Sequence, residues 1–392
     1  MSVITLYSLY LIFGLTLSQL IPLFVPTFLP VLTEPLQVVS MICLSYIMIL
    51  VGAEFNIDRS NPKQYSMDYF VAATAAACPW IFVALYYMFF FFDAHWVDFN
   101  SWRESLVISR FAAPTSAGIL FTMLAAAGLA KTWVFKKARI LAVFDDLDTV
   151  LLTIPLKILF VGLRWQLFLM LLMMVTLLVV AWYYQHTLKW KTSPRFIFYY
   201  AAGITLVSEL VYLIGYQINP EVPIYLGVVL PSFVLGMLLR VEHKAIVAPD
   251  MQKLSHYVSS IFMVIVGISM PFMGELVQGD IPYGILVLHV VGVTILSNLG
   301  KCFALFCYRK EATLRQRLAV SIALFPRREM SAGKIIVTIS YGLGGVAIAV
   351  SLLSLCLNLV LTGVIISAVK YLCESDELLC DAGETEHPKQ VT

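Results

Sequence analysis

Long apolar stretches alternate with short polar connections along almost the whole chain. Twelve of these stretches reach the length of a membrane-spanning helix, for which about 20 residues rising ~1.5 Å each cover the hydrocarbon core. They lie at about 3–25, 36–54, 67–92, 104–130, 138–163, 165–185, 196–217, 222–239, 255–277, 281–308, 318–341 and 344–372. This pattern predicts an all-α membrane protein in which residues 1–373 form one polytopic domain of about twelve transmembrane helices.

The composition agrees with a membrane protein and narrows the function. Hydrophobic residues make up 60% of the 392 positions and charged residues only 13%, whereas a soluble domain carries about a quarter charged residues. A net charge of +2 gives no reason to expect a nucleic-acid partner. The chain has no room for a soluble nucleotide-binding domain. We therefore expect no cofactor, no enzymatic activity and, for a transporter, an ion gradient as the energy source.

The positive residues are distributed unevenly between the connections. Sixteen Lys and Arg residues follow the even-numbered stretches, whereas only Arg103 and Arg164 occupy the alternate connections. Since positive residues favour the cytoplasmic side, both termini are expected in the cytoplasm, and the short connections favour a bacterial inner membrane. Residues 374–392 carry many acids and few apolar positions, which predicts a disordered cytoplasmic tail.

The fifth stretch, from Arg139 to Gly162, carries acids inside an apolar helix. It reads RILAVFDDLDTVLLTIPLKILFVG and places Asp145, Asp146 and Asp148 within the membrane. An ionised carboxylate at that depth costs about 2.5 to 3.5 kcal/mol, so these acids need water, a partner or a cation. Asp145 and Asp148 share one helix face at a spacing of three, while Asp146 points roughly 100° away. We therefore expect Asp145 and Asp146 to perform different tasks.

Carboxylates also suit exchange chemistry. A dehydrated monovalent cation needs several oxygen ligands, and a carboxylate can bind either the cation or a proton. Lys301 in the tenth stretch is the natural partner for one of the aspartates, because a buried lysine balances charge and can lose its proton. The alternative is that Lys301 snorkels to the cytoplasmic face, since Arg309 is only eight residues further on.

Two of the stretches contain matching interruptions. The tripeptide Ser-Ala-Gly begins at Ser116 in the fourth stretch and again at Ser331 in the eleventh, 215 positions later, each time after a mid-helix proline, Pro114 or Pro326. The two stretches are seven apart, an odd number, so equivalent helices run in opposite directions. Inverted repeats with two crossed, discontinuous helices mark the midplane site of secondary transporters, and core stretches are expected at about 67–163 and 281–373. The simpler alternative is two ordinary proline kinks.

The run LAVFDDLDTVLL, the pair Gly300-Lys301 and the proline-interrupted stretches resemble the sodium/proton antiporters of the cation/proton antiporter superfamily, especially the electrogenic branch with paired aspartates. The resemblance extends from the second stretch to the twelfth. It implies that Asp146 carries the cation and the proton and that Asp145 pairs with Lys301. It also implies a homodimer.

The same resemblance places Thr115 and Ser116 beside the ion. The expected ligands of the transported Na⁺ are therefore Asp146, Asp145 and Thr115. No other metal site is implied.

The second crossing helix carries a Pro-Arg-x-Glu pattern of the same family at Pro326, Arg327 and Glu329. Asp148 and Arg328 depart from the family, in which these positions usually hold a small residue and a glycine. Arg327, Arg328 and Glu329 are expected to balance the ends of the half-helices and each other rather than contact the ion.

The expected function is exchange of a monovalent cation, Na⁺ or Li⁺, for protons by alternating access across the lipid bilayer. Two other transporters are alternatives, a K⁺/H⁺ exchanger and a sodium-coupled organic anion carrier of similar architecture. An intramembrane aspartyl protease would need its acids on separate helices and a Gly-x-Gly-Asp pattern, which the chain lacks. A channel would not require an aspartate paired with a lysine.

Overall fold

The structure is a computed structural model that describes residues 3–24, 28–55, 62–92, 98–162, 164–220, 224, 227–240, 249–270, 282–327 and 346–385. Within the helices, the side chains at positions 28–34, 62, 146, 149–150, 153, 156–157, 159–161, 249 and 376–385 are outside this description. The helices are α1 (Val3–Phe24), α2 (Phe28–Ala53), α3 (Pro62–Phe90), α4 (Phe99–Ser109), η1 (Arg110–Ala112), α5 (Ala117–Ala126), α6 (Trp133–Val161), α7 (Trp165–Tyr183), α8 (Pro194–Ile218), α9 (Val229–Leu238), α11 (Pro249–Ile268), α12 (Tyr283–Lys301), η2 (Cys302–Phe306), α13 (Leu314–Ala323) and α15 (Val346–Thr385).

The helices have the length and composition of membrane spans. Eight of the described helices could cross a bilayer, namely α1, α2, α3, α7, α8, α11, α12 and α15. Each of the twelve stretches expected from the sequence contains a helix, and no strand occurs in the ranges that the structure describes. The prediction of an all-α membrane protein is confirmed.

The helix that carries the acidic run begins earlier than the apolar pattern indicated. α6 starts at Trp133 rather than near residue 138, because the Thr132 side chain caps it by accepting a hydrogen bond from Phe135 N at 3.2 Å. Such a cap satisfies one of the free N–H groups of the first turn. The additional turn brings Lys137 into the helix, well before Asp145.

The last helix runs past the end of the twelfth apolar stretch. α15 continues to Thr385, beyond Glu374, where the predicted tail begins. Arg315 holds the start of this extension by donating to the Ser375 carbonyl O at 3.1 Å and to its Oγ at 2.7 Å. Residues 386–392 lie outside the description.

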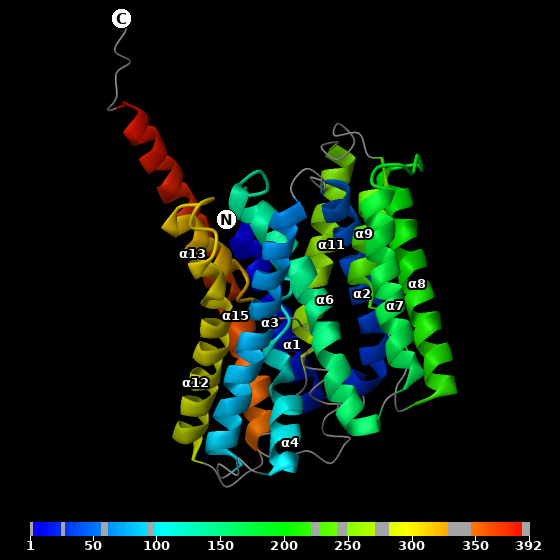
Figure 1. Cartoon of the computed structure of the whole chain (residues 1–392), viewed down its shortest axis with the longest axis vertical. Helices are drawn as coiled ribbons and strands as arrows, with labels where there is room; N and C mark the ends of the chain where they lie inside the picture. The colour runs from blue at the N-terminus through cyan, green and yellow to red at the C-terminus, as the bar shows by residue number, and fades with distance from the viewer. Residues whose placement is uncertain are drawn as a thin grey trace, which may run out of the picture.

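The helices form two packed groups (Figure 1). In one group, α11 packs against α1 and α2, while α9 packs against α2 and α7. In the other, α3 packs against α4, α6 and α12, and α15 packs against α12 and α13. Contacts of α1 with α15 and of α6 with α9 join the groups. α1 begins and α15 ends at the same end of the bundle.

Two helix crossings in the first group are close enough to require glycine. Gly14 and Gly267 bring α1 against α11, and Gly52 and Gly236 bring α2 against α9, so that a Cβ on any of the four would overlap the backbone of the facing helix. Gly52 and Gly267 lie 215 positions apart, the spacing of the two Ser-Ala-Gly tripeptides. Gly14 and Gly236 lie 222 positions apart, so one glycine of each crossing follows that spacing and the other does not.

Candidate ion-binding site at the helix crossing

The fourth membrane stretch is broken inside the bundle. α4 continues as one 3-10 turn, η1, and the chain then leaves the helical conformation around Pro114. Proline lacks the N–H that would continue the helix. Ser116 starts α5, its Oγ accepting a hydrogen bond from Ile119 N at 3.4 Å. The break therefore leaves two helix ends with free backbone polar groups within the protein.

A second break crosses the first. Thr115 pairs with Arg327 in an antiparallel bridge that follows the end of α13. Ser116 N donates to the Pro326 carbonyl at 2.9 Å, and Thr115 Oγ1 donates to the Leu324 carbonyl at 3.1 Å. Each segment thus satisfies backbone groups of the other, which a hydrocarbon environment could not do. The first interruption is a true break rather than a proline kink. At the second, α13 ends at Ala323 before Pro326, and the residues that follow Arg327 lie outside the described ranges.

Asp145 lies beside this crossing and is only 1% exposed. Its Oδ2 accepts a hydrogen bond from Thr115 N at 2.6 Å. The Lys301 ammonium lies 3.1 Å from Oδ1 and 3.2 Å from Oδ2, and it also donates to the Ala113 carbonyl at 2.7 Å. Lys301 is fully buried at 0% exposure. It is therefore an internal ion-pair partner of Asp145 and does not snorkel to the surface.

Arg327 is also buried, and its guanidinium contacts carbonyl groups rather than a carboxylate. It donates to the Ala112 carbonyl at the end of η1 and to the Ser297 carbonyl on α12 at 2.6 Å. Positive charge stabilises the carbonyl end of a helix. Arg327 therefore balances the carbonyl end of a half-helix. Arg328 and Glu329 lie outside the described residues.

Asn358 on α15 is a site residue that the sequence did not reveal. Its Oδ1 accepts a hydrogen bond from Arg327 N at 3.2 Å, much as Asp145 accepts one from Thr115 N. The two acceptors are 213 positions apart, close to the spacing of the paired prolines, so an aligned search of the repeat could have found it. One half of the repeat thus carries an ionisable acid where the other half carries a neutral amide.

Asp148 adds another buried carboxyl on α6, at 2% exposure. Its Oδ2 accepts no hydrogen bond from the residues that the structure describes, while the carboxyl interacts with the Tyr69 side chain of α3. Asp145 and Asp148 therefore lie on the same buried side of α6, as their spacing indicated. The Asp146 side chain is outside the description.

A second buried aspartate, Asp68, lies six residues after the start of α3 at Pro62. The Lys137 ammonium of α6 contacts both of its oxygens, at 2.8 and 3.2 Å, and the Tyr308 hydroxyl donates to its Oδ1 at 2.6 Å. Lys137 also lies 3.1 Å from Glu311, which is partly exposed. Burial raises the pKa of the Tyr308 hydroxyl and Asp68 adds to the rise, so Tyr308 stays a donor at neutral pH.

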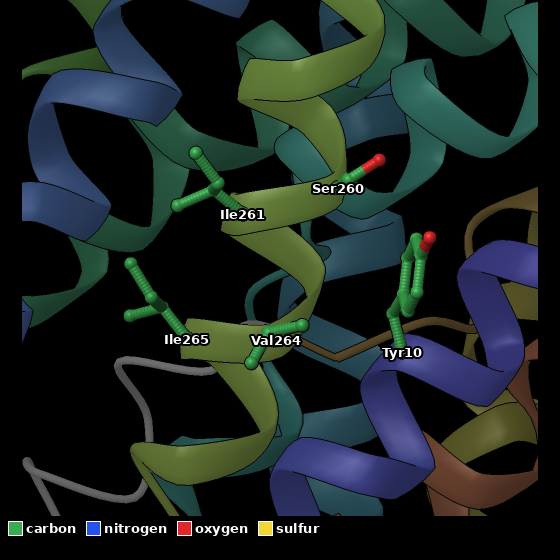
Figure 2. Close-up of a pocket in the computed structure, with 5 residues that line it drawn as sticks. All are labelled: Tyr10, Ser260, Ile261, Val264 and Ile265. Carbon is green, nitrogen blue, oxygen red and sulfur yellow. The ribbon is translucent and has the colours of Figure 1, made fainter.

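An apolar pocket of about 240 Å³ lies between α1 and α11, away from these charges. Figure 2 shows Tyr10 on α1 and Ser260, Ile261, Val264 and Ile265 along α11. These side chains supply no carboxylate or other charged ligand. The pocket is therefore a poor candidate for the binding of a cation.

Comparison with known proteins identifies a shared fold. No protein-family model matches the chain, and no curated protein matches its sequence. Among solved structures, the sodium/proton antiporter MjNhaP1 from Methanocaldococcus jannaschii matches with a TM-score of 0.52 over 95% of this chain and 91% of that one. The two proteins share a fold. Their sequences are 13% identical, so the similarity concerns the arrangement of helices.

Proposed function

We propose that the protein exchanges a monovalent cation, Na⁺ or Li⁺, for protons by alternating access. One observation carries the proposal: buried Asp145 is paired with buried Lys301 where two broken helices cross. A cation that binds Asp145 must displace the Lys301 ammonium, because both use the same carboxylate oxygens. Protons compete for the same oxygens. Such mutual exclusion is the minimum that coupled exchange requires, and the shared fold with a sodium/proton antiporter supports it.

The remaining site residues have proposed roles around this pair. Asp146 is the second carboxylate ligand and the obligatory carrier of cation and proton. Thr115 orients Asp145 through its N–H and, with Ser116, offers hydroxyl oxygens to the cation. Asp148 supplies an additional acid one turn along α6.

The proposed movement follows the two packed helix groups. The group containing α3, α6, α12, α13 and α15 would carry the site, while the group around α2 and α11 would stay fixed in the membrane. We further propose that the protein is a homodimer with both termini in the cytoplasm of a bacterial cell. An organic anion carrier is less well supported, since Arg327 is only 3% exposed and its two terminal NH₂ groups already donate to carbonyl groups.

Purified protein in proteoliposomes with an internal pH dye tests this function. Addition of NaCl or LiCl should move protons across the membrane, and KCl added separately tests the K⁺ alternative. Asp146→Asn should yield folded protein without exchange, because it removes the ionisable ligand. The matched control is Glu209→Gln, which neutralises an acid of α8 outside the crossing and should leave exchange intact. Sodium-dependent proton flux at the wild-type rate in Asp146→Asn would show that Asp146 is not the obligatory carrier.

A further inference from the structure

The two helices that carry the central ion pair have little direct packing between them. Asp145 belongs to α6 and Lys301 ends α12, but both helices pack along α3 and hardly against each other. A contact between two such side chains depends on how far each helix is shifted along α3. Contacts of α3 therefore bear directly on their relative height, alongside those of α13, which packs against α6 and η2.

Asp68 of α3 contacts one residue on α6 and one in the segment that follows α12 and η2. Its partner Lys137 lies eight residues before Asp145 on α6, a rise of about 12 Å. Its other partner, Tyr308, lies seven residues after Lys301, just beyond η2. One carboxylate thus joins the two elements that carry Asp145 and Lys301.

The backbone conformation of Tyr308 indicates that neighbouring contacts hold this residue in place. Tyr308 has φ of 54°, a left-handed conformation that is unfavourable for an aromatic residue and persists only where surrounding contacts enforce it. Its ring lies 4.4 Å from the Lys137 ammonium and packs edge-on against Trp133. The hydroxyl and the ring therefore both hold this residue in place.

We propose that Asp68, Lys137 and Tyr308 form a clamp in which Asp68 is a positioning residue that fixes the height of α6 relative to α12 and so keeps Lys301 in contact with Asp145. The clamp does not touch the transported ion. It sets how firmly Lys301 competes with an incoming cation. This part of the inference rests on the proposed exchange function.

Tyr308→Phe is the sharpest test, because it removes one O–H donor and leaves every charge in place. A looser clamp weakens the central pair, so the KM for sodium should fall about fivefold, as expected for the loss of about one hydrogen bond, while kcat changes little. In a Lys301→Gln background no pair remains to be positioned, and Tyr308→Phe should then leave the KM unchanged. An unchanged KM in the otherwise native chain, or an equal change in both backgrounds, overturns the clamp.

Tyr87→Phe is the matched control. Tyr87 is a fully buried tyrosine of α3 whose hydroxyl bonds Ser351 at 2.6 Å, outside the clamp. It should lower thermal stability without changing the sodium KM, since its contact does not link α6 to α12. An equal fall in KM for Tyr87→Phe would mean that general loosening explains the effect and would overturn the proposal.

A measurement without transport separates this inference from the proposed function. In a thermal-unfolding cycle of Tyr308→Phe and Lys301→Gln, the two losses should be clearly non-additive, because one residue acts through the other. Additive losses overturn the clamp. If the native protein moves no protons with any cation, the exchange function fails, and this cycle still decides whether the clamp positions the pair.

Discussion

Asp145 and Asp68 each lie opposite a buried lysine, and the surroundings of the two pairs differ. Lys301 has no exposed surface, and its ammonium contacts only Asp145 and the Ala113 carbonyl among the described residues. Lys137 reaches from buried Asp68 to partly exposed Glu311. Lys137 therefore has a second acid within ion-pair distance, whereas among the described residues Lys301 has Asp145 alone within that distance.

The central pair gives a stability prediction at the level of single residues. Asp145→Asn or Lys301→Gln alone strands a buried charge, which costs roughly 3 to 5 kcal/mol, whereas removing both charges is nearly neutral. The double variant should therefore recover much of the stability that either single variant loses, while proton coupling stays impaired. Thermal unfolding of the four proteins measures this. Simple addition of the two single losses would show that the residues do not interact in the membrane.

At the level of elements, the crossing depends on charges placed at broken helix ends. The carbonyl groups of Ala112 and Ala113 come at the end of η1, where no further helical N–H is available. Arg327 binds the first and Lys301 binds the second. Two cations therefore stabilise one helix end, but only Lys301 is also bound to an acid that a cation could claim.

Helix crossings in the other group give a second stability prediction. Gly267→Ala places a methyl group on the Leu11 carbonyl of α1 and should destabilise the protein by about 1 to 3 kcal/mol through overpacking. Gly203→Ala on α8 is the matched control, since nothing lies within 4 Å of a Cβ there. It should be neutral or stabilising by up to about 1 kcal/mol, because alanine is the better helix former. Equal thermal shifts for both variants would refute the close crossing.

At the level of the whole molecule, the proposed exchange would require one helix group to move past the other. α1 contacts α11 in the first group and α15 in the second, and α6 contacts both α3 and α9. These helices line the boundary across which such a movement would occur. The clamp joins α3, α6 and the segment after η2, all within the group proposed to move.

Charge movement is the property to test at this scale. Under the proposed function, Asp145, Asp146 and Lys301 are the groups that exchange protons, and we propose that two protons move against one cation. Exchange should then be electrogenic: sodium-driven proton flux should generate a membrane potential in sealed proteoliposomes and respond to an imposed one. Voltage-sensitive dye and valinomycin-clamped vesicles measure both effects. Transport that neither generates nor responds to a potential would establish a one-for-one stoichiometry.

Much of the architecture could be predicted from the sequence because its causes are local. Apolar runs of bilayer length specify membrane helices wherever they occur, and a proline interrupts a helix through its own missing N–H. The spacing of Asp145 and Asp148 placed them on one side of a helix before any packing was known. The single acidic run inside α6 also indicated where an ion site should be sought.

Tertiary packing decided which of these residues meet. The sequence left Lys301 either paired with an aspartate or snorkelling, and only the course of α12 places it on Asp145, 156 positions away. Asp68 and Tyr308 are 240 positions apart, and neither stands out in the apolar pattern of its own stretch. A hydrogen bond between distant residues depends on the height and rotation of two helices against a third. Those quantities come from the packing of many side chains together and are not encoded in the period of any one helix.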